Sequence, residues 1–172
     1  MSINTHPHIH EQVVCANMFV RKDGKYLLLR RSPLKKYAPN YVHPVGGKVD
    51  KNENPFVAAQ RELMEETGIS VVNVRLEAVI LEIRPEQDEP YNWLIFHFSG
   101  DYDKGDVKRT EEGELVLLSA DELKKEKLSP SVKPIIEHIL DREKGTIFTT
   151  VEYEKDQDHV VLKQTLDYCA IG

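Results

Sequence analysis

Residues 46–69 read GGKVDKNENPFVAAQRELMEETGI and carry the strongest structural signal in the chain. Asn54-Pro55 predicts the start of a helix, because asparagine caps free amides and proline fits the first helical position. Gly68 predicts the end of that helix, since glycine is common just past a helical C-terminus. We therefore expect a helix over 55–67 that follows a glycine turn.

The predicted helix has an acidic side and an apolar side. At about 100° per residue, the side chains of Glu62, Glu65 and Glu66 share one face. The apolar side lies roughly a quarter-turn away and is expected to pack on the core; it consists of Phe56, Ala59 and Leu63.

The acidic side predicts a site for a divalent cation. Three like charges on one face repel each other, and a cation placed among them turns that repulsion into binding. Carboxylate oxygens suit Mg²⁺ or Mn²⁺, and Mg²⁺ often binds through carboxylates together with substrate phosphates. Gly46 and Gly47 let a ligand approach the backbone, so the Gly46 carbonyl can add another oxygen. A merely solvated acidic face is the alternative interpretation.

Two further charged residues of this stretch predict a structural contact. Glu53 and Arg61 are spaced so that an ion pair can fix the glycine turn against the helix. We expect this pair to position other groups rather than to take part in chemistry.

The same stretch resembles a known motif at nine defined positions. Glycine, five residues, glutamate, seven residues and then Arg-Glu-apolar-x-Glu-Glu-x-Gly-apolar is the pattern of the Nudix box. It is matched by Gly47, Glu53, Arg61, Glu62, Leu63, Glu65, Glu66, Gly68 and Ile69. The resemblance implies the Nudix fold, an α/β/α sandwich with a mixed β-sheet. It also implies an enzyme that hydrolyses a nucleoside diphosphate linked to another moiety.

The resemblance also implies which residues act. Glu62, Glu65, Glu66 and the Gly46 carbonyl are the expected metal ligands, with Mg²⁺ or Mn²⁺ activating a water molecule for attack on phosphorus. The family often adds a later carboxylate as base or ligand. Candidates for that role are Glu112 first, with Glu111 and Glu114 as alternates. Candidates for binding substrate phosphate are Arg31, preferred over Arg30, and Lys48.

Segments outside the box are similar to MutT-type enzymes, which cleave oxidised purine triphosphates such as 8-oxo-dGTP. These segments are 91–98, 111–114 and 147–153, and with the box the similarity covers roughly residues 13–153. Asn92 and Trp93 can bind a base by hydrogen bonding and stacking, although a core tryptophan at a strand start is an equal alternative. Val45 separates Pro44 from the glycines, where many Nudix loops have Pro-Gly-Gly.

Other functions stay open beside the purine triphosphate hypothesis. The substrate can instead be ADP-ribose, a nucleotide sugar or a dinucleoside polyphosphate. A Nudix-fold isomerase is disfavoured, because the cysteine expected just before the metal site is missing between Cys15 and Cys169. A non-catalytic Nudix-fold ligand sensor is the third option, and the retained box carboxylates count against it.

The rest of the chain predicts strands interleaved with short helices. A hairpin is expected around Asp23-Gly24, and 32–44 is expected to be a loop. Further strands are predicted near 74–83, 93–98, 115–118, 146–153 and 160–162, with helices after Ser119 and over 131–142. We expect one α/β or α+β domain over residues 1–172, with 1–12 as a flexible N-terminus.

Composition limits the partners that the chain can be expected to bind. Its 172 residues carry a net charge of −6, which disfavours a long nucleic acid but allows a local basic pocket for a nucleotide-like small molecule. No apolar run approaches the roughly 20 residues that span a bilayer, and the start of the chain lacks a signal-peptide pattern. We expect a cytoplasmic protein with no membrane partner and two free thiols. Nudix proteins often pair, so a homodimer remains open.

Three groups of basic residues have two interpretations each. His43, next to the glycines, can contact substrate or be an ordinary loop histidine. Lys35-Lys36 can steer anions or be solvated. The alternating His6, His8 and His10 can form a metal site, but a mobile terminus is the preferred interpretation.

Overall fold

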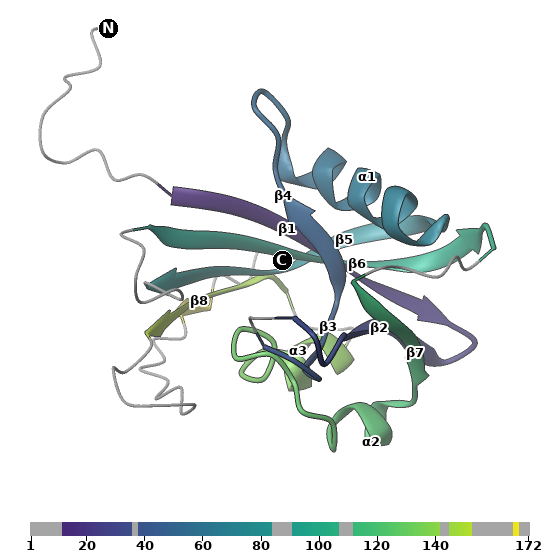
Figure 1. The fold of residues 1–172 in the computed structure, drawn as a ribbon. Helices are drawn as coiled ribbons and strands as arrows, with labels where there is room; N and C mark the ends of the chain where they lie inside the picture. Colours follow the sequence, from purple (N-terminus) through teal and green to yellow (C-terminus); the bar gives the residue numbers. More distant parts are fainter. Residues whose placement is uncertain are drawn as a thin grey trace, which may run out of the picture.

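A mixed β-sheet forms the centre of the computed structural model (Figure 1). The structure describes residues 12–35, 38–83, 91–106, 112–141 and 145–152, and the backbone of 167–168. In chain order the elements are β1 (Gln12–Lys22), β2 (Lys25–Arg31), β3 (Val42–His43), β4 (Val45–Lys48), α1 (Pro55–Thr67), β5 (Ser70–Ile83), β6 (Asn92–Lys104), β7 (Gly113–Leu118), α2 (Ala120–Leu123), α3 (Ile136–Leu140), β8 (Ile147–Glu152) and β9 (Asp167–Tyr168).

The sheet combines antiparallel and parallel pairs, as predicted. Its order is β3-β2-β1-β6-β5-β8-β9, with β4 added beside β1 and β7 beside β2. The pairs β1–β6 and β5–β8 are parallel, and the other pairs are antiparallel. Parallel neighbours require long connections, and the connection between β1 and β6 contains the box helix α1.

The predicted hairpin joins β1 and β2. Its turn residues Asp23 and Gly24 have φ angles of 51° and 74°, the left-handed conformation that Asp-Gly adopts readily. The predicted loop over 32–44 is only partly a loop, because β3 pairs with β2 near its end. The glycine pair predicted as a turn instead lies in β4, antiparallel to β1. Strands of two and four residues are too short to show a pattern in sequence.

Helix α1 has the predicted bounds and caps. The Asn54 side chain accepts a hydrogen bond from the Val57 amide at 3.1 Å, and Gly68 adopts a left-handed φ of 74°. Ala59 and Leu63 are buried, as predicted. Phe56 differs from the prediction, since it is 46 % exposed. It lies in the first helical turn, and its ring meets the Phe98 ring edge to face.

The sheet has a hydrophobic core on each face, which confirms the α/β/α sandwich. Figure 1 shows α1 above the sheet and the short helices α2 and α3 below it. The core under α1 includes Met18, Leu29, Val45, Leu63 and Phe98. The core on the opposite face includes Phe19, Leu28, Ile80, Ile95 and Ile139. Alternation along β1 explains the division, since successive side chains point to opposite faces.

The helix predicted over 131–142 is shorter than expected. Residues 131–135 form turns, and the regular helix begins at Ile136, after Ile135 as its N-cap. Pro134 accounts for the difference, because proline lacks an amide hydrogen and disfavours helical geometry in the residue before it. The helix after Ser119 forms as predicted, with a reciprocal capping box between Ser119 and Glu122.

Several predictions fall on residues outside the described ranges. These are the flexible N-terminus up to residue 11, the strand over 160–162, Glu111 and the thiol of Cys169. Cys15 is buried as a free thiol, as predicted. No helix in the described part of the chain is long and apolar enough to cross a bilayer.

Candidate active site

The glycines of β4 bring the backbone against the acidic side of α1. A Cβ atom built on Gly47 would lie 2.6 Å from Cδ of Glu62, so the Glu62 carboxylate occupies the space of a side chain. A Cβ atom on Gly46 would lie 2.2 Å from the Ala16 carbonyl oxygen of the neighbouring strand. Both positions therefore require glycine for close approach, which explains this part of the motif physically.

Arg61 connects the strand, the following turn and the helix. Its guanidinium donates two hydrogen bonds to Glu53, at 3.0 and 2.9 Å, and one to Glu62 at 2.8 Å. It also donates to Glu65 at 3.1 Å and to the Lys48 carbonyl at 3.2 Å. The predicted Glu53–Arg61 ion pair is thus present. These hydrogen bonds from Arg61 hold the pKa of Glu53 below its usual range.

Glu66 stands in a different environment from the other box glutamates. Burial, together with the negative charges of Glu62 and Glu112, raises the pKa of Glu66 to about 7. The positive charges of Arg31 and Lys35 lower the pKa of Glu66 and so offset part of this rise. The buried Oε2 atom of Glu66 has no hydrogen-bond partner in the structure. A buried carboxylate oxygen surrounded by like charge is a position that a cation would satisfy.

The donor set fits a hard divalent cation. Glu62, Glu65 and Glu66 supply carboxylate oxygens from one helix, and Gly46 lies in the adjoining strand. Within the described ranges, no three acidic, histidine or cysteine side chains are already gathered around one point. Arg61 instead holds Glu62 and Glu65, so a cation there would replace its contacts. The metal roles of these residues remain a prediction.

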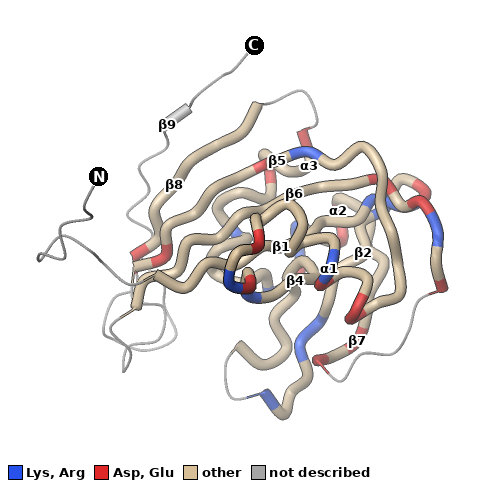
Figure 2. The backbone as a smooth tube through the Cα atoms, turned by 90° about the horizontal axis from the view of Figure 1, so that it is seen from above, with Lys and Arg blue, Asp and Glu red and all other residues tan. Residues whose placement is uncertain are grey.

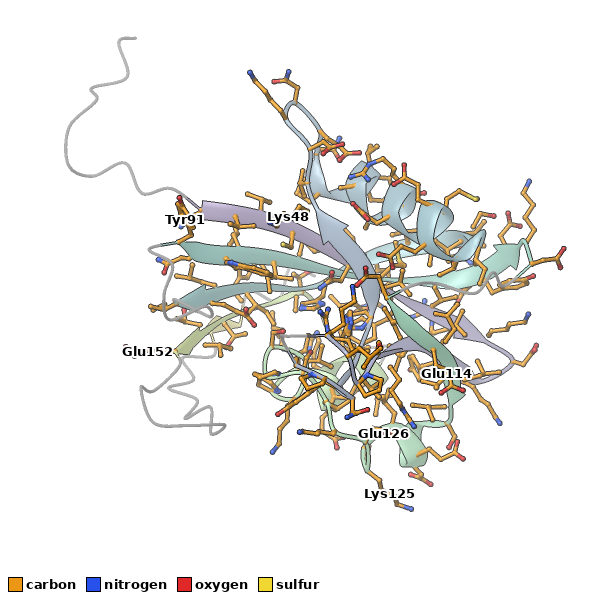
Figure 3. The ribbon with its side chains drawn as sticks, viewed as in Figure 1. Lys48, Tyr91, Glu114, Lys125, Glu126 and Glu152 are labelled. Carbon is orange, nitrogen blue, oxygen red and sulfur yellow. The ribbon has the colours of Figure 1, made fainter. Side chains whose placement is uncertain are left out.

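Glu112 lies immediately before β7, close enough to the box helix for its charge to act on Glu66. Pairing of β7 with β2 brings Glu112 beside the loop that follows Arg31. The Ser32 amide of that loop donates a hydrogen bond to the Glu112 carbonyl at 3.0 Å. Lys35 Nζ lies 2.6 and 2.7 Å from its two carboxylate oxygens. Glu114, the alternate candidate, is exposed further along β7 (Figure 3). Among the described carboxylates of this turn, Glu112 is the one whose charge acts on Glu66.

A cavity of about 300 Å³ begins where β4 meets the box helix. Gly47, which contacts Glu62 on one side, also lines this cavity. Its wall is built from β1, β2, β3, β4, β5, β6 and the segment 129–131. The lining residues are Cys15, Asn17, Arg31, Ala38, His43, Gly46, Gly47, Lys48, Glu82, Trp93, Ile95, Ser129, Pro130 and Ser131.

Three of the five predicted substrate residues line this cavity: Arg31, Lys48 and Trp93. Arg30 does not, and its Nη2 instead donates to Glu126 Oε1 at 2.7 Å (Figure 3). Asn92 is also outside the lining, because it neighbours Trp93 in β6 and adjacent side chains of a strand point to opposite faces. Figure 2 shows acidic and basic positions close together around α1 and β4.

Sequence reasoning missed Glu82, Asn17 and Ser129 as lining residues. Glu82 gave a usable signal, since it interrupts the apolar run 78–83 at the end of β5, and the structure leaves it only 3 % exposed. Ser129 gave none, because the backbone pairing that brings it to the cavity joins segments far apart in sequence. His43, for which the sequence allows two interpretations, lies in the cavity wall.

Comparison with known proteins agrees with this geometry. The model of the NUDIX domain matches residues 10–139, which is well over half of the chain. The chain belongs to the Nudix family. It is a MutT-type Nudix hydrolase, of the class that acts on phosphoanhydride bonds in small nucleotide-like substrates, and the family generally uses a divalent metal.

Two relatives illustrate the range of the similarity. The chain is 29 % identical over 143 residues to the uncharacterized Nudix hydrolase YvcI of Bacillus subtilis, covering 80 % of this chain and 87 % of YvcI. It is 34 % identical over 101 residues to the NAD-capped RNA hydrolase NudC of Chromobacterium violaceum. That match covers 58 % of this chain and 34 % of NudC, so the chain spans about a third of that relative.

Solved structures share the fold. A MutT protein from Bacillus halodurans superposes with a TM-score of 0.75 at 24 % identity, over 90 % of this chain and 97 % of that protein. A MutT protein from Methanosarcina mazei gives a TM-score of 0.65 at 28 % identity, over 78 % and 96 % of the two chains. The fold described above is thus shared with these solved structures.

Proposed function

We propose that the chain is a Mg²⁺-dependent pyrophosphohydrolase that converts an oxidised purine nucleoside triphosphate, such as 8-oxo-dGTP, to its monophosphate and pyrophosphate. The observation that carries this proposal is the cavity beside the Nudix box. Gly47 is shared between the cavity wall and the contact with Glu62, so a base in the cavity would leave its phosphates at the acidic side of α1. Mn²⁺ would serve in place of Mg²⁺.

Each group of residues has a distinct task in this proposal. Glu62, Glu65, Glu66 and the Gly46 carbonyl would hold the metal, which neutralises phosphate charge and lowers the pKa of a bound water. Arg31 and Lys48, which both line the cavity, would bind phosphate oxygens. Glu112, held near Glu66 by Lys35, would accept the proton of the attacking water.

Arg61 would act by positioning rather than by contact with substrate. It holds Glu62, Glu65 and the Lys48 carbonyl at the same time, and Glu53 in turn fixes its guanidinium through two hydrogen bonds. Preorganised ligands lose little freedom when a cation arrives, so binding is stronger than for mobile side chains. The bidentate contact needs arginine, because lysine offers only a point charge.

The similarity to NudC favours a second candidate substrate class, a dinucleotide or another nucleotide conjugate. ADP-ribose, nucleotide sugars and dinucleoside polyphosphates share the same phosphoanhydride group. A cavity of about 300 Å³ is at the lower end of the range for ligand sites, which favours one base over two. The cavity size therefore supports the triphosphate as the first choice.

The net charge and the cavity size support a small nucleotide as partner in preference to a long nucleic acid. A cytoplasmic location, where such nucleotides occur, is part of the proposal.

A substrate screen in Mg²⁺ tests the proposal. Purified chain is incubated with 8-oxo-dGTP, the four unmodified triphosphates, ADP-ribose, diadenosine polyphosphates and nucleotide sugars, and the products are separated. We expect the highest kcat/KM for 8-oxo-dGTP, pyrophosphate as the second product, and no turnover after chelation of the metal. Faster hydrolysis of a conjugate than of every triphosphate would support the second candidate instead.

A further inference from the structure

The backbone and the side chain of Glu112, the candidate base, are held in different ways. The backbone is fixed by strand pairing: the Ser32 amide donates to the Glu112 carbonyl at 3.0 Å, and Gly113 pairs with β2 at Arg31. A Cβ atom on Gly113 would lie 2.1 Å from the Arg30 carbonyl oxygen, so this close approach requires glycine. The fold therefore fixes the Glu112 backbone without help from its side chain.

The side chain of Glu112 forms an ion pair with Lys35. Nζ of Lys35 lies 2.7 Å from Oε1 and 2.6 Å from Oε2, so one ammonium group contacts both oxygens. The two side chains are 33 % and 39 % exposed. Because solvent screens an ion pair at this exposure, it changes an equilibrium constant by no more than about fivefold. A ligand that binds Lys35 more strongly can therefore replace this contact.

Lys35 follows Arg31 on a short turn at the edge of the site. The Lys35 amide donates to the Ser32 carbonyl at 3.1 Å, and the Leu34 amide donates to the Ser32 hydroxyl at 3.2 Å. These hydrogen bonds fix the backbone of the turn, while the four-carbon stem of lysine leaves its ammonium group mobile. The ammonium group can thus change its partner without movement of the turn.

The Lys35–Glu112 pair lies within electrostatic range of the box helix. The negative charge of Glu112 raises the pKa of Glu66, and the positive charge of Lys35 lowers it. Substrate phosphates bound with a cation at the acidic side would occupy the same region. A polyphosphate brings several negative charges, against one on Glu112, and forms charge-assisted hydrogen bonds with an ammonium group. Phosphate is thus the stronger of the two partners for Lys35.

Resting on the proposed function, we propose that Lys35 exchanges Glu112 for a phosphate of the substrate, and that this exchange makes Glu112 available as the base. Without substrate, the ammonium group contacts both oxygens to which the attacking water would donate. With substrate, the ammonium group binds phosphate, and strand pairing keeps Glu112 in place. The Glu112 carboxylate then accepts the proton of the water. Polyphosphate binding and activation of the base are coupled in this way.

Nucleotide binding in Mg²⁺, measured by calorimetry, tests whether Lys35 contacts the phosphates. The probes are dGMP and a non-hydrolysable analogue of dGTP, which share the base and differ in the β- and γ-phosphates. In Lys35→Gln we expect the Kd of the triphosphate to rise about tenfold and the Kd of dGMP to change by less than about twofold. Lys35→Arg keeps the charge and should recover most of the triphosphate affinity.

A second exposed ion pair supplies the matched control. Lys124 and Glu137 lie 2.9 Å apart, outside the site. Lys124→Gln should change neither dissociation constant. The salt dependence of triphosphate binding gives a further readout: it should become shallower in Lys35→Gln and stay as in the wild type in Lys124→Gln, because only the first variant removes a contact between ligand and cation.

Glu112→Gln tests the exchange itself. Removal of the competing carboxylate should tighten triphosphate binding by up to about fivefold, the change that corresponds to an exposed ion pair. The same substitution in the Lys35→Gln background should give little gain, because no lysine has to leave its partner. Equal gains in both backgrounds would mean that Glu112 only repels the phosphates, and would overturn the exchange.

Kinetics separates the exchange from a static positioning role. In Lys35→Gln the exchange predicts a KM raised by about tenfold and a kcat changed by less than about threefold, because substrate also releases Glu112 in the wild type. A fall in kcat with unchanged KM and unchanged triphosphate Kd would mean that Lys35 holds Glu112 in its working position. That result would overturn the inference.

The inference and the proposed function fail under different results. Selective loss of triphosphate binding in Lys35→Gln, together with faster hydrolysis of a nucleotide conjugate than of 8-oxo-dGTP, would keep the exchange and reject the proposed substrate. Preferred hydrolysis of 8-oxo-dGTP with unchanged triphosphate affinity in Lys35→Gln would do the reverse.

Discussion

The acidic side of α1 and the adjoining cavity meet at Gly47, yet their polar groups are satisfied differently. Around α1, charges of opposite sign pair within the chain: Arg61 binds three glutamates, and Lys35 binds Glu112. In the cavity, His43 and Ser129 each leave a polar atom without a partner. On the acidic side, the protein itself thus pairs most of the charges, with Oε2 of Glu66 as an atom left without a partner.

This difference separates two kinds of specificity. A cation at α1 must displace contacts of Arg61, so the cluster recognises charge and can serve any diphosphate. In the proposed function, the cavity would hold the base and so would distinguish one nucleotide from another.

Loss of Glu66 should have the largest effect on turnover. Glu66→Gln removes the oxygen that has no partner, so kcat should fall by about a thousandfold or more. The fold should persist, because the substitution removes a partly buried charge beside Glu62 and Glu112. Steady-state rates with 8-oxo-dGTP and circular dichroism measure the two effects. The exposed variant Glu137→Gln serves as control, and wild-type turnover in Glu66→Gln would reject the metal assignment.

Gly47→Ala changes the residue that both contacts Glu62 and lines the cavity, and it should have the second-largest effect on turnover. A new Cβ atom would lie 2.6 Å from the Glu62 carboxylate and force it to move, so kcat should fall by about tenfold to a hundredfold. Gly24→Ala is the matched control: nothing lies within 4 Å of its new Cβ, although its φ of 74° costs some stability. Equal rates for the two variants would show that close packing on Glu62 is unnecessary.

Arg61→Lys should weaken the acidic cluster while keeping its charge. Lysine cannot reproduce the bidentate contact with Glu53 or reach Glu62, Glu65 and the Lys48 carbonyl together. We expect a lower affinity for Mn²⁺, measured by titration, and about tenfold lower kcat/KM. Arg75→Lys, outside the site, should leave both unchanged. Unaltered Mn²⁺ affinity in Arg61→Lys would assign the network to stability alone.

The smallest expected effect is a dependence of stability on pH from His97, a buried residue of β6 close to His43 of the cavity wall. Burial, with a smaller effect from His43, lowers the pKa of His97 in β6 to about 3. Since unfolded histidine titrates near pH 6.5, the unfolded chain binds the proton first. Stability from this residue is therefore complete above pH 6.5 and is lost as pH falls towards 3.

Urea unfolding at pH 7 and pH 5 measures this contribution. At pH 5 the depressed pKa of His97 corresponds to a loss on the order of 2 kcal/mol. His97→Leu should reduce the difference in unfolding free energy between the two pH values by that order. An unchanged difference would mean that His97 is protonated without cost in the folded chain.

Local sequence signals predicted much of the fold. Asn54, Pro55 and Gly68 set the bounds of α1, and Asp23-Gly24 set the hairpin, because each acts through its own backbone geometry. The parallel pairing of β1 with β6 could not be predicted, since it joins residues about 80 positions apart. The shortened α3 was an avoidable error, as Pro134 lies within the predicted helix.

The candidate site also has one part that the sequence predicts and one part that it does not. The box glutamates follow from spacing on one helix, so sequence alone placed them together. The cavity assembles Glu82, His43 and Ser129 from β5, β3 and a late turn, and no local pattern connects these segments. The sequence predicts that Asn92 and Trp93 bind a base together, but strand alternation separates their side chains and only Trp93 lines the cavity.

The most direct measurement is a crystal grown with Mn²⁺ and a non-hydrolysable analogue of 8-oxo-dGTP, with the ion located by anomalous scattering. Our account predicts an Mn²⁺ peak coordinated by Glu66 and at least one of Glu62 and Glu65, with the diphosphate completing its ligands and the base in the cavity against Trp93. An analogue bound in the cavity with no ion at these glutamates, and Arg61 still holding Glu62 and Glu65, would contradict it.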